Sequence, residues 1–268
     1  MGKQDLDNLR RKYAERQEQK EKRANGGGNT DFLKNFMQLE EGDNPVRFLP
    51  GKDGNLFYAE TFIHQVQSGD NKKNIHCLRV HGETCPLCEL YFNLFKIEKG
   101  GGDHFKPLAR EIKRRQRFYA NVLDRKTGEV KILSYGEKLN DNLMTNIFNP
   151  DFQVVDPETK EEDSLLNPRV GYDYIVRKKT VKGADGTYPN YDASQPRPKQ
   201  SALAENTGAI NAILEKRHDI HGLVRKEKYD EVKQLAEGII ATKAPTVTIF
   251  GRPANVVTED KESEELKG

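Results

Sequence analysis

Four residues of this chain have the types and spacing of a metal centre: His64, Cys77, Cys85 and Cys88. Three thiolates and one imidazole form the ligand set of a closed tetrahedral zinc site. The two residues between Cys85 and Cys88 let both sulfurs reach one ion from a single turn, which Pro86 restricts. Because four protein ligands leave no position for an activated water, we expect one Zn²⁺ with a structural role.

The histidine ligand of this site has two candidates. We favour His64, and His81 is the alternative because it lies in the loop close to the cysteine pair. His76 adjoins Cys77 on a predicted strand and would point to the opposite face. The competing interpretation of the whole set is three free buried cysteines beside unrelated histidines.

A catalytic metal is the other alternative, because a His-x-Glu followed by a Cys-x-x-Cys is typical of nucleobase deaminases. In that chemistry the His-x-Glu lies on one helix and the cysteine pair opens another. Here only Thr84 separates Glu83 from Cys85. The spacing therefore favours a structural metal.

A cationic run precedes two aromatic residues in the middle of the chain. Residues 106–131 contain nine basic and three acidic side chains. Alternation along a strand turns Phe118 and Tyr119 to opposite faces, so one ring can stack while the other packs. Cations neutralise phosphates, and a flat ring stacks on any base, so this pattern indicates single-stranded nucleic-acid binding. The candidates here are Lys113, Arg114, Arg115, Arg117, Phe118 and Tyr119, with Tyr135 on the next strand.

A second region of the same kind lies between residues 169 and 199. Its candidates are Arg177, Lys178 and Lys179, followed by Tyr188 and Tyr191. The alternative is a solvated cationic face over aromatic residues that fill the core, and for Phe118 or Tyr135 taken singly it is the better interpretation. Two such regions on one domain favour nucleic-acid binding.

Short runs rich in β-branched and aromatic residues predict the strands that must carry these side chains. They cover residues 46–49, 56–66, 75–80, 117–123, 130–135 and 171–181. Glycine-containing separators such as residues 125–128 and 183–186 suit hairpin turns. We therefore expect a mainly β, α+β fold built on an OB-like antiparallel barrel of roughly five or six strands, with a small zinc-binding subdomain over about residues 60–110.

Composition and patterning predict one main domain with arms. Residues 1–28 form a basic amino-terminal arm with a glycine-rich hinge, and residues 29–200 form the core. Residues 201–257 form two helices packed on the barrel, with a late strand near residues 246–250, and residues 258–268 are a short acidic tail. The net charge of +2 is the small difference between 44 basic and 42 acidic residues. The local distribution of these charges along the chain is therefore the better indicator of binding partners.

The sequence also excludes several classes of protein. It has no apolar stretch long enough for a membrane span and no apolar signal region, which predicts a soluble intracellular protein. Three clustered cysteines argue against a disulfide framework. Since no Walker loop, nucleophile elbow or dense carboxylate cluster is present, we expect no enzymatic activity.

Several motifs resemble those of the T-even-type bacteriophage single-stranded DNA-binding proteins, also called helix-destabilising proteins. They are Val46-Arg47-Phe48-Leu49-Pro50, the spacing of His64 and Cys77, Cys85-Pro86-Leu87-Cys88, the basic run before Phe118-Tyr119-Ala120-Asn121, and Asn190-Tyr191-Asp192. The likeness covers about residues 44–200. This chain departs from the family pattern in a shorter loop between Cys77 and Cys85, a tyrosine at position 119 in place of tryptophan, and a shorter acidic tail.

This resemblance implies an OB-like barrel and a zinc subdomain with a DNA cleft between them. By position, Tyr119, Tyr188 and Tyr191 resemble base-stacking rings, and residues 113–115 resemble phosphate ligands. The family implies coating of exposed strands in phage DNA replication, recombination and repair, in the cytoplasm of an infected bacterial host. It also implies self-association along the strand through the amino-terminal arm and contacts with replication and recombination proteins through the tail. A zinc-containing RNA-binding regulator and a protein-interaction module are the alternatives.

Overall fold

The computed structural model describes residues 30–52, 54–68, 71–99, 105–183, 186–244 and 247. The predicted amino-terminal arm, the acidic tail and most of the late strand at 246–250 lie outside the described residues. The chain divides into two compact units, Met1–Phe36 and Met37–Gly268. In the first unit, helix α2 spans Thr30–Leu33.

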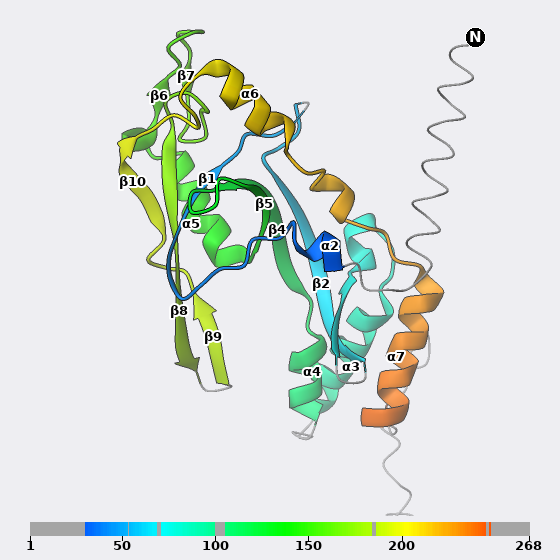
Figure 1. The fold of residues 1–268 in the computed structure, drawn as a ribbon. Coiled ribbons are helices and arrows are strands. Elements are labelled where there is room, and N and C mark those ends of the chain that lie inside the picture. The colour runs from blue at the N-terminus through cyan, green and yellow to red at the C-terminus, as the bar shows by residue number, and fades with distance from the viewer. Residues whose placement is uncertain are drawn as a thin grey trace, which may run out of the picture. The chain divides into compact units, whose positions relative to one another are not determined.

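Antiparallel strands form the centre of the second unit, as the sequence predicts. The strands are β1 (Gly42–Phe48), β2 (Tyr58–Ser68), β3 (Asn71–His76), β4 (Arg115–Asp124), β5 (Val130–Tyr135), β8 (Tyr172–Gly183), β9 (Gly186–Asn190) and β10 (Gln195–Gln200). Their order is β10-β8-β1-β4-β2-β3, with β5 beside β4 and β9 beside β8 (Figure 1). Strands β6 (Val154–Val155) and β7 (Glu162–Asp163) pair separately. The mixed α+β class is confirmed, and in the described part of the chain the pairings form an open path.

The strand predicted over residues 75–80 lies four residues earlier in the chain, at Asn71–His76. Strand β3 ends at His76, and the 3₁₀ helix η1 (Leu78–His81) follows directly. Gly82 ends η1 at a φ of 75°, a left-handed conformation that glycine adopts without steric cost. This turn reverses the chain and brings Cys85 back toward Cys77.

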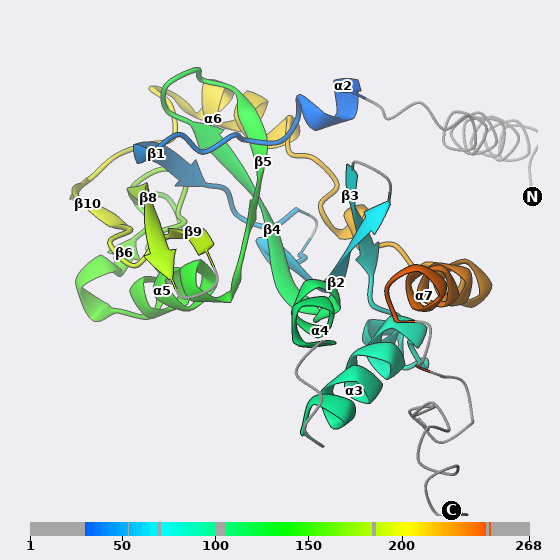
Figure 2. The ribbon, with the colours of Figure 1, turned by 90° about the horizontal axis from the view of Figure 1, so that it is seen from below.

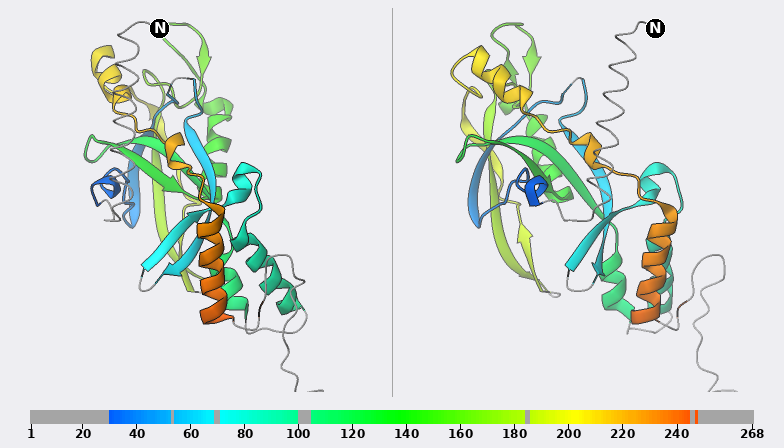
Figure 3. Two further views of the ribbon diagram at one scale, coloured as in Figure 1. Left: turned by 90° about the vertical axis from the view of Figure 1, so that its right-hand side faces the viewer. Right: turned by 45° about the vertical axis from the view of Figure 1, so that its right-hand side comes forward.

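Among the described residues, the second unit has two large apolar cores. One contains residues of β1, β4, β5 and β8 together with helix α5 (Glu137–Ile147). The other contains β2 and β3 residues together with helices α3 (Pro86–Lys99), α4 (Lys106–Ile112) and α7 (Tyr229–Lys243), which gather in one group in Figures 2 and 3. No helix among the described residues has both the length and the apolar character that crossing a membrane requires.

The two carboxyl-terminal helices pack on different cores, whereas the sequence predicts both on the barrel. Helix α6 (Thr207–Glu215) does contact the sheet, because Ile210 packs with Leu49 of the chain following β1 and Leu123 of β4. Helix α7 instead places Val232 and Ala236 in the core of α3 and α4. This core also contains Val66 of β2 and Ile75 of β3, so α7 shares it with two strands as well as with the helices. The apolar spacing of α7 specifies a buried face without specifying the partner.

A fully buried arginine of β1, Arg47, connects this strand to the loop before β8 and to the residue after β10. The Arg47 guanidinium donates through Nη2 to the carbonyl oxygens of Asn167, at 2.6 Å, and Ser201, at 3.1 Å. Gly171 makes room for it, because a Cβ there would come within 2.6 Å of Nη2. Burial lowers the pKa of Arg47 to about 10, although Asp173 raises it. The guanidinium therefore stays protonated at neutral pH, and its N–H groups donate to buried carbonyls.

We expect Arg47→Met to lower the free energy of unfolding by about 3 kcal/mol, because it leaves two buried carbonyl acceptors without their donor. Urea denaturation measures this change. The matched control is Arg197→Met, which alters an exposed arginine on β10 and should have little effect. A similar stability for both variants would contradict the assignment.

Candidate functional site

The structure brings the four predicted metal ligands into one buried cluster: His64, Cys77, Cys85 and Cys88. Their ligand atoms all lie within 4.8 Å of one another. The sulfur of Cys88 lies 3.5 Å from the sulfur of Cys77 and 3.5 Å from Nε2 of His64. The sulfur of Cys85 is also 3.5 Å from this nitrogen.

Each ligand is positioned by a defined element. Antiparallel pairing of β2 with β3 places His64 opposite Ile75, near the end of β3 where Cys77 follows. The N–H of Cys77 donates to the carbonyl of Phe62 at 2.8 Å, which holds it against β2. Cys85 immediately precedes α3, and Cys88 lies in the first turn of that helix, where Pro86 at the first position needs no N–H partner.

A hydrogen bond orients the imidazole of His64. Nδ1 lies 2.7 Å from the carbonyl oxygen of Ile112, so Nδ1–H donates and Nε2 faces the sulfurs. Burial alone would lower the pKa of His64, but hydrogen bonds with Cys77 and Cys85 outweigh it and raise the pKa to about 9. Hydrogen bonds from Cys77 and Cys88 lower the pKa of Cys85 below its usual range. Hydrogen bonds with Cys77 and Cys85 raise the pKa of Cys88, so one thiol of the cluster gives up its proton more readily while its neighbour keeps its own.

This geometry fits a zinc ion. A tetrahedral ion with bonds of about 2.0–2.3 Å to nitrogen and sulfur has ligand-to-ligand distances of about 3.5–3.8 Å. The observed separations of 3.5 Å match that range. A carbonyl partner on the second imidazole nitrogen is also usual for a metal-binding histidine. The cluster can therefore hold a metal such as Zn²⁺.

The other two histidines of this region lie elsewhere. His81 is exposed at the end of η1 and is not part of the cluster. His76 interacts with Oγ1 of Thr61, with Nδ1 3.1 Å away. Of the two histidine candidates, the structure thus places His64 against the sulfurs.

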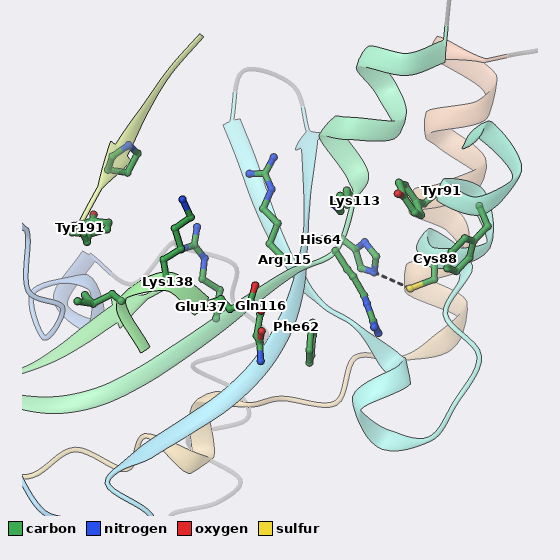
Figure 4. A pocket seen from close by; sticks show the side chains of 16 residues that line it. Phe62, His64, Cys88, Tyr91, Lys113, Arg115, Gln116, Glu137, Lys138 and Tyr191 are labelled. Atoms are coloured by element: carbon green, nitrogen blue, oxygen red, sulfur yellow. Dashed lines mark hydrogen bonds between the residues drawn. The ribbon is translucent and has the colours of Figure 1, made fainter. Parts of the chain in front are cut away.

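A cleft with a volume of about 630 Å³ lies next to this cluster. Figure 4 shows Tyr191 across this space from Tyr91 and Cys88, with Lys138 and Arg115 between them. The lining comes from β2, α3, β4, the start of α5 and the chain around the end of β9. It comprises Phe62, His64, Cys88, Tyr91, Phe92, Lys113, Arg114, Arg115, Gln116, Arg117, Gly136, Glu137, Lys138, Leu139, Pro189 and Tyr191. One end of the metal cluster thus forms part of the cleft wall.

The cleft brings the two predicted basic and aromatic regions together. All four candidate cations of the first region line the cleft. Tyr191 is the one candidate of the second region in the lining. The remaining candidates of the second region lie outside the lining. Arg177 donates through Nη2 to Oδ2 of Asp43 at 2.9 Å, and Lys178 donates to the carbonyl of Leu39 at 3.0 Å. Lys179 and Tyr188 are exposed on the β8–β9 hairpin.

Side-chain alternation along the strands puts the predicted aromatic rings of β4 and β5 on two different faces of the sheet. Phe118 and Tyr135 are buried and stack on each other, with centroids 5.6 Å apart and planes 21° apart. Tyr119, on the opposite face of β4, is half-buried, and burial raises its pKa. In this structure Phe118 and Tyr135 are core residues, and a DNA contact by any of the three stays a prediction.

The cleft residues that lie on helices are not among those predicted from the sequence. Tyr91 and Phe92 lie on α3, and Phe92 is 43% exposed. An exposed ring in an otherwise amphipathic helix is the signal that could have identified Phe92. Lys138 lies at the start of α5, and its sequence neighbourhood gives no such signal, because long-range packing alone carries it to the cleft.

Comparison with known proteins gives one family. A family model described as gp32 DNA binding protein like matches residues 40–242. That range contains the metal cluster, the cleft lining, helices α3 to α6 and all of α7 except its last residue. A search of the curated proteins gives no significant match.

We expect purified protein to contain about one zinc ion per chain, and His64→Ala to lose most of it, because three sulfurs alone leave the tetrahedron open. Elemental analysis measures the metal. His64→Cys should restore binding through a four-cysteine set, and His81→Ala should leave the zinc content unchanged. Full zinc in His64→Ala would contradict the ligand assignment.

Proposed function

We propose, on the premise that this chain belongs to the gp32-like DNA-binding protein family, that it coats exposed single-stranded DNA without reading its sequence. Its setting would be phage DNA replication, recombination and repair, in an infected bacterial cell. One observation carries the proposal. A single cleft collects the cations of residues 113–117 and aromatic rings from both of its sides.

The chemistry of the cleft suits a flexible anionic strand. Lys113, Arg114, Arg115, Arg117 and Lys138 provide five cations against the single carboxylate of Glu137. Each phosphate they neutralise releases counterions, which supplies affinity independent of sequence. Tyr91 and Tyr191 offer ring faces on which any base can stack. Stacking and charge together favour unpaired bases, because the faces of paired bases are covered by their neighbours in a duplex.

Zinc would act as a structural support for one side of this cleft. His64, Cys77, Cys85 and Cys88 would hold it, and the ion would supply binding energy that adds to folding energy. His64 and Cys88 belong to the cleft lining, and α3 carries Tyr91 and Phe92. We further propose that the strands around β1, β4, β5 and β8 form the OB-like barrel of the family. The protein would act by binding alone, with no catalytic step.

The two ends of the chain would serve association. Residues 1–28 are basic, and we propose that they contact the neighbouring protein along the strand. The short acidic segment 258–268 would meet replication and recombination proteins.

We expect Tyr191→Ala to weaken binding of single-stranded DNA by roughly 1–3 kcal/mol, because it removes one stacking surface. Fluorescence anisotropy of a labelled oligothymidylate measures the affinity. Tyr191→Phe keeps the ring and should bind like the wild type.

The same assay tests the proposed function itself. The wild-type protein should bind the single strand far more tightly than a duplex of the same length. Equal affinity for both would contradict the proposal, and stronger binding of the matching RNA would favour an RNA-binding regulator.

Deleting residues 1–28 should reduce clustering on long single strands more than binding to a short oligonucleotide, because a contact between neighbours requires two proteins on one strand. Electron microscopy of partly covered circular single strands shows the clustering, and anisotropy gives the short-strand affinity. Equal losses in both measurements would contradict a cooperativity arm.

A further inference from the structure

A second cavity, of about 320 Å³, lies beside the cleft. Its lining comes from β2, from η1 and from the residue before β4: Glu60, Thr61, Phe62, Arg79, Val80 and Arg114. Phe62 and Arg114 line both cavities, so the two are adjacent. Of this lining only Arg114 belongs to the predicted binding regions, and Arg79 does not.

Two stacks of an arginine on a phenylalanine connect the cavities. The guanidinium carbon of Arg114 lies 4.6 Å from the ring centroid of Phe62. The guanidinium carbon of Arg79 lies 5.2 Å from the ring centroid of Phe92. Phe92 lines the cleft while Arg79 lines the second cavity, so this stack also spans the boundary.

The polar groups of the second cavity favour an anion. Arg79 and Arg114 are exposed and contribute two positive charges against the carboxylate of Glu60. Oε1 of Glu60 already accepts a hydrogen bond from Nε2 of Gln116 at 2.6 Å. An arginine that stacks on a ring keeps its N–H groups at the edge of its plane, where they can bind phosphate oxygens in pairs.

The apolar groups of the cavity suit a base or sugar. Val80 is 39% exposed, and the ring of Phe62 is half-buried. A cavity with two arginines and an apolar surface can thus hold both parts of a nucleotide.

We propose that the second cavity is a subsite for a nucleotide beyond the main cleft, with Arg79 and Arg114 binding the phosphate where the strand crosses between the cavities. This inference rests on the proposed function and extends it. It makes Arg79 a DNA ligand for long strands only, because a strand that just fills the cleft does not reach the second cavity.

The test compares Arg79→Gln with the wild type on oligothymidylates of about 4 and about 16 nucleotides. On the long strand we expect a roughly tenfold loss of affinity, the size of one charge-assisted hydrogen bond. The slope of log affinity against log salt should fall by about 0.7, the value for one phosphate of a single strand. On the short strand both quantities should stay unchanged.

Two control variants separate a ligand role from other causes. Lys216→Gln removes one exposed cation at the end of α6, outside both cavities, and should leave affinity and slope unchanged on both strands. Arg79→Lys keeps the charge and should restore the salt slope. Because Arg79 lies between two metal-cluster cysteines, the zinc content of each variant is measured in parallel and should equal that of the wild type.

The outcomes distinguish this inference from the proposed function. If the wild-type protein binds neither strand, both are overturned. If the wild type binds and Arg79→Gln binds the long strand equally well, only the second subsite is overturned. Equal losses on short and long strands, or a loss of zinc in Arg79→Gln, would also overturn it.

Discussion

Burial of three sulfurs and one imidazole in a single cluster is the constraint on which one side of the cleft depends. A buried thiolate without compensating charge is costly, so these side chains must share protons or a cation. The cluster draws β2, the turn after β3 and the start of α3 to one point. Its orienting hydrogen bond ends on the carbonyl of Ile112, the residue before Lys113. The contact that fixes the imidazole thus also positions the beginning of the cationic run.

The cleft beside the cluster concentrates like charges at some cost to the folded protein. Five cations share its lining with the carboxylate of Glu137. Their mutual repulsion disfavours the folded protein alone and is relieved by a polyanion. Two of the predicted cations outside the cleft have partners of their own. Arg177 pairs with Asp43, and Lys178 binds a backbone carbonyl.

The carboxyl-terminal segment connects the two sides of the second unit. Helix α6 packs on β1 and β4 residues, and α7 packs in the core of α3 and α4. Between the helices, Arg217 donates to the carbonyls of Pro50, at 2.8 Å, and Gly51, at 2.6 Å. The carbonyl of His218 accepts from Nδ2 of Asn121 at 3.0 Å. Since this segment contacts both sides, its packing sets the relation between the sheet and the metal cluster.

The sequence by itself determined features that depend on short spacing. The two residues between Cys85 and Cys88 specify a shared ligand turn, and alternation along β4 turns Phe118 and Tyr119 to opposite faces. Strands β1, β2, β4, β5 and β8 follow from local periodicity, whereas β9 and β10 lie outside the predicted ranges. The choice between His64 and His81 stayed open in the sequence, and the pairing of β2 with β3 in the structure places His64 against the sulfurs.

Only the tertiary structure decided which distant residues meet. It brought Tyr91 and Lys138 to the cleft, placed Arg79 and Arg114 in the lining of one cavity, and packed α7 into the core of α3 and α4. It also placed the rings of Phe118 and Tyr135 together in the core, beneath a surface where the sequence predicts binding. The physical reason is that the pattern of apolar and charged residues in one segment determines which face of that segment is buried or exposed. Which other segment covers the buried face depends on the packing of the whole chain.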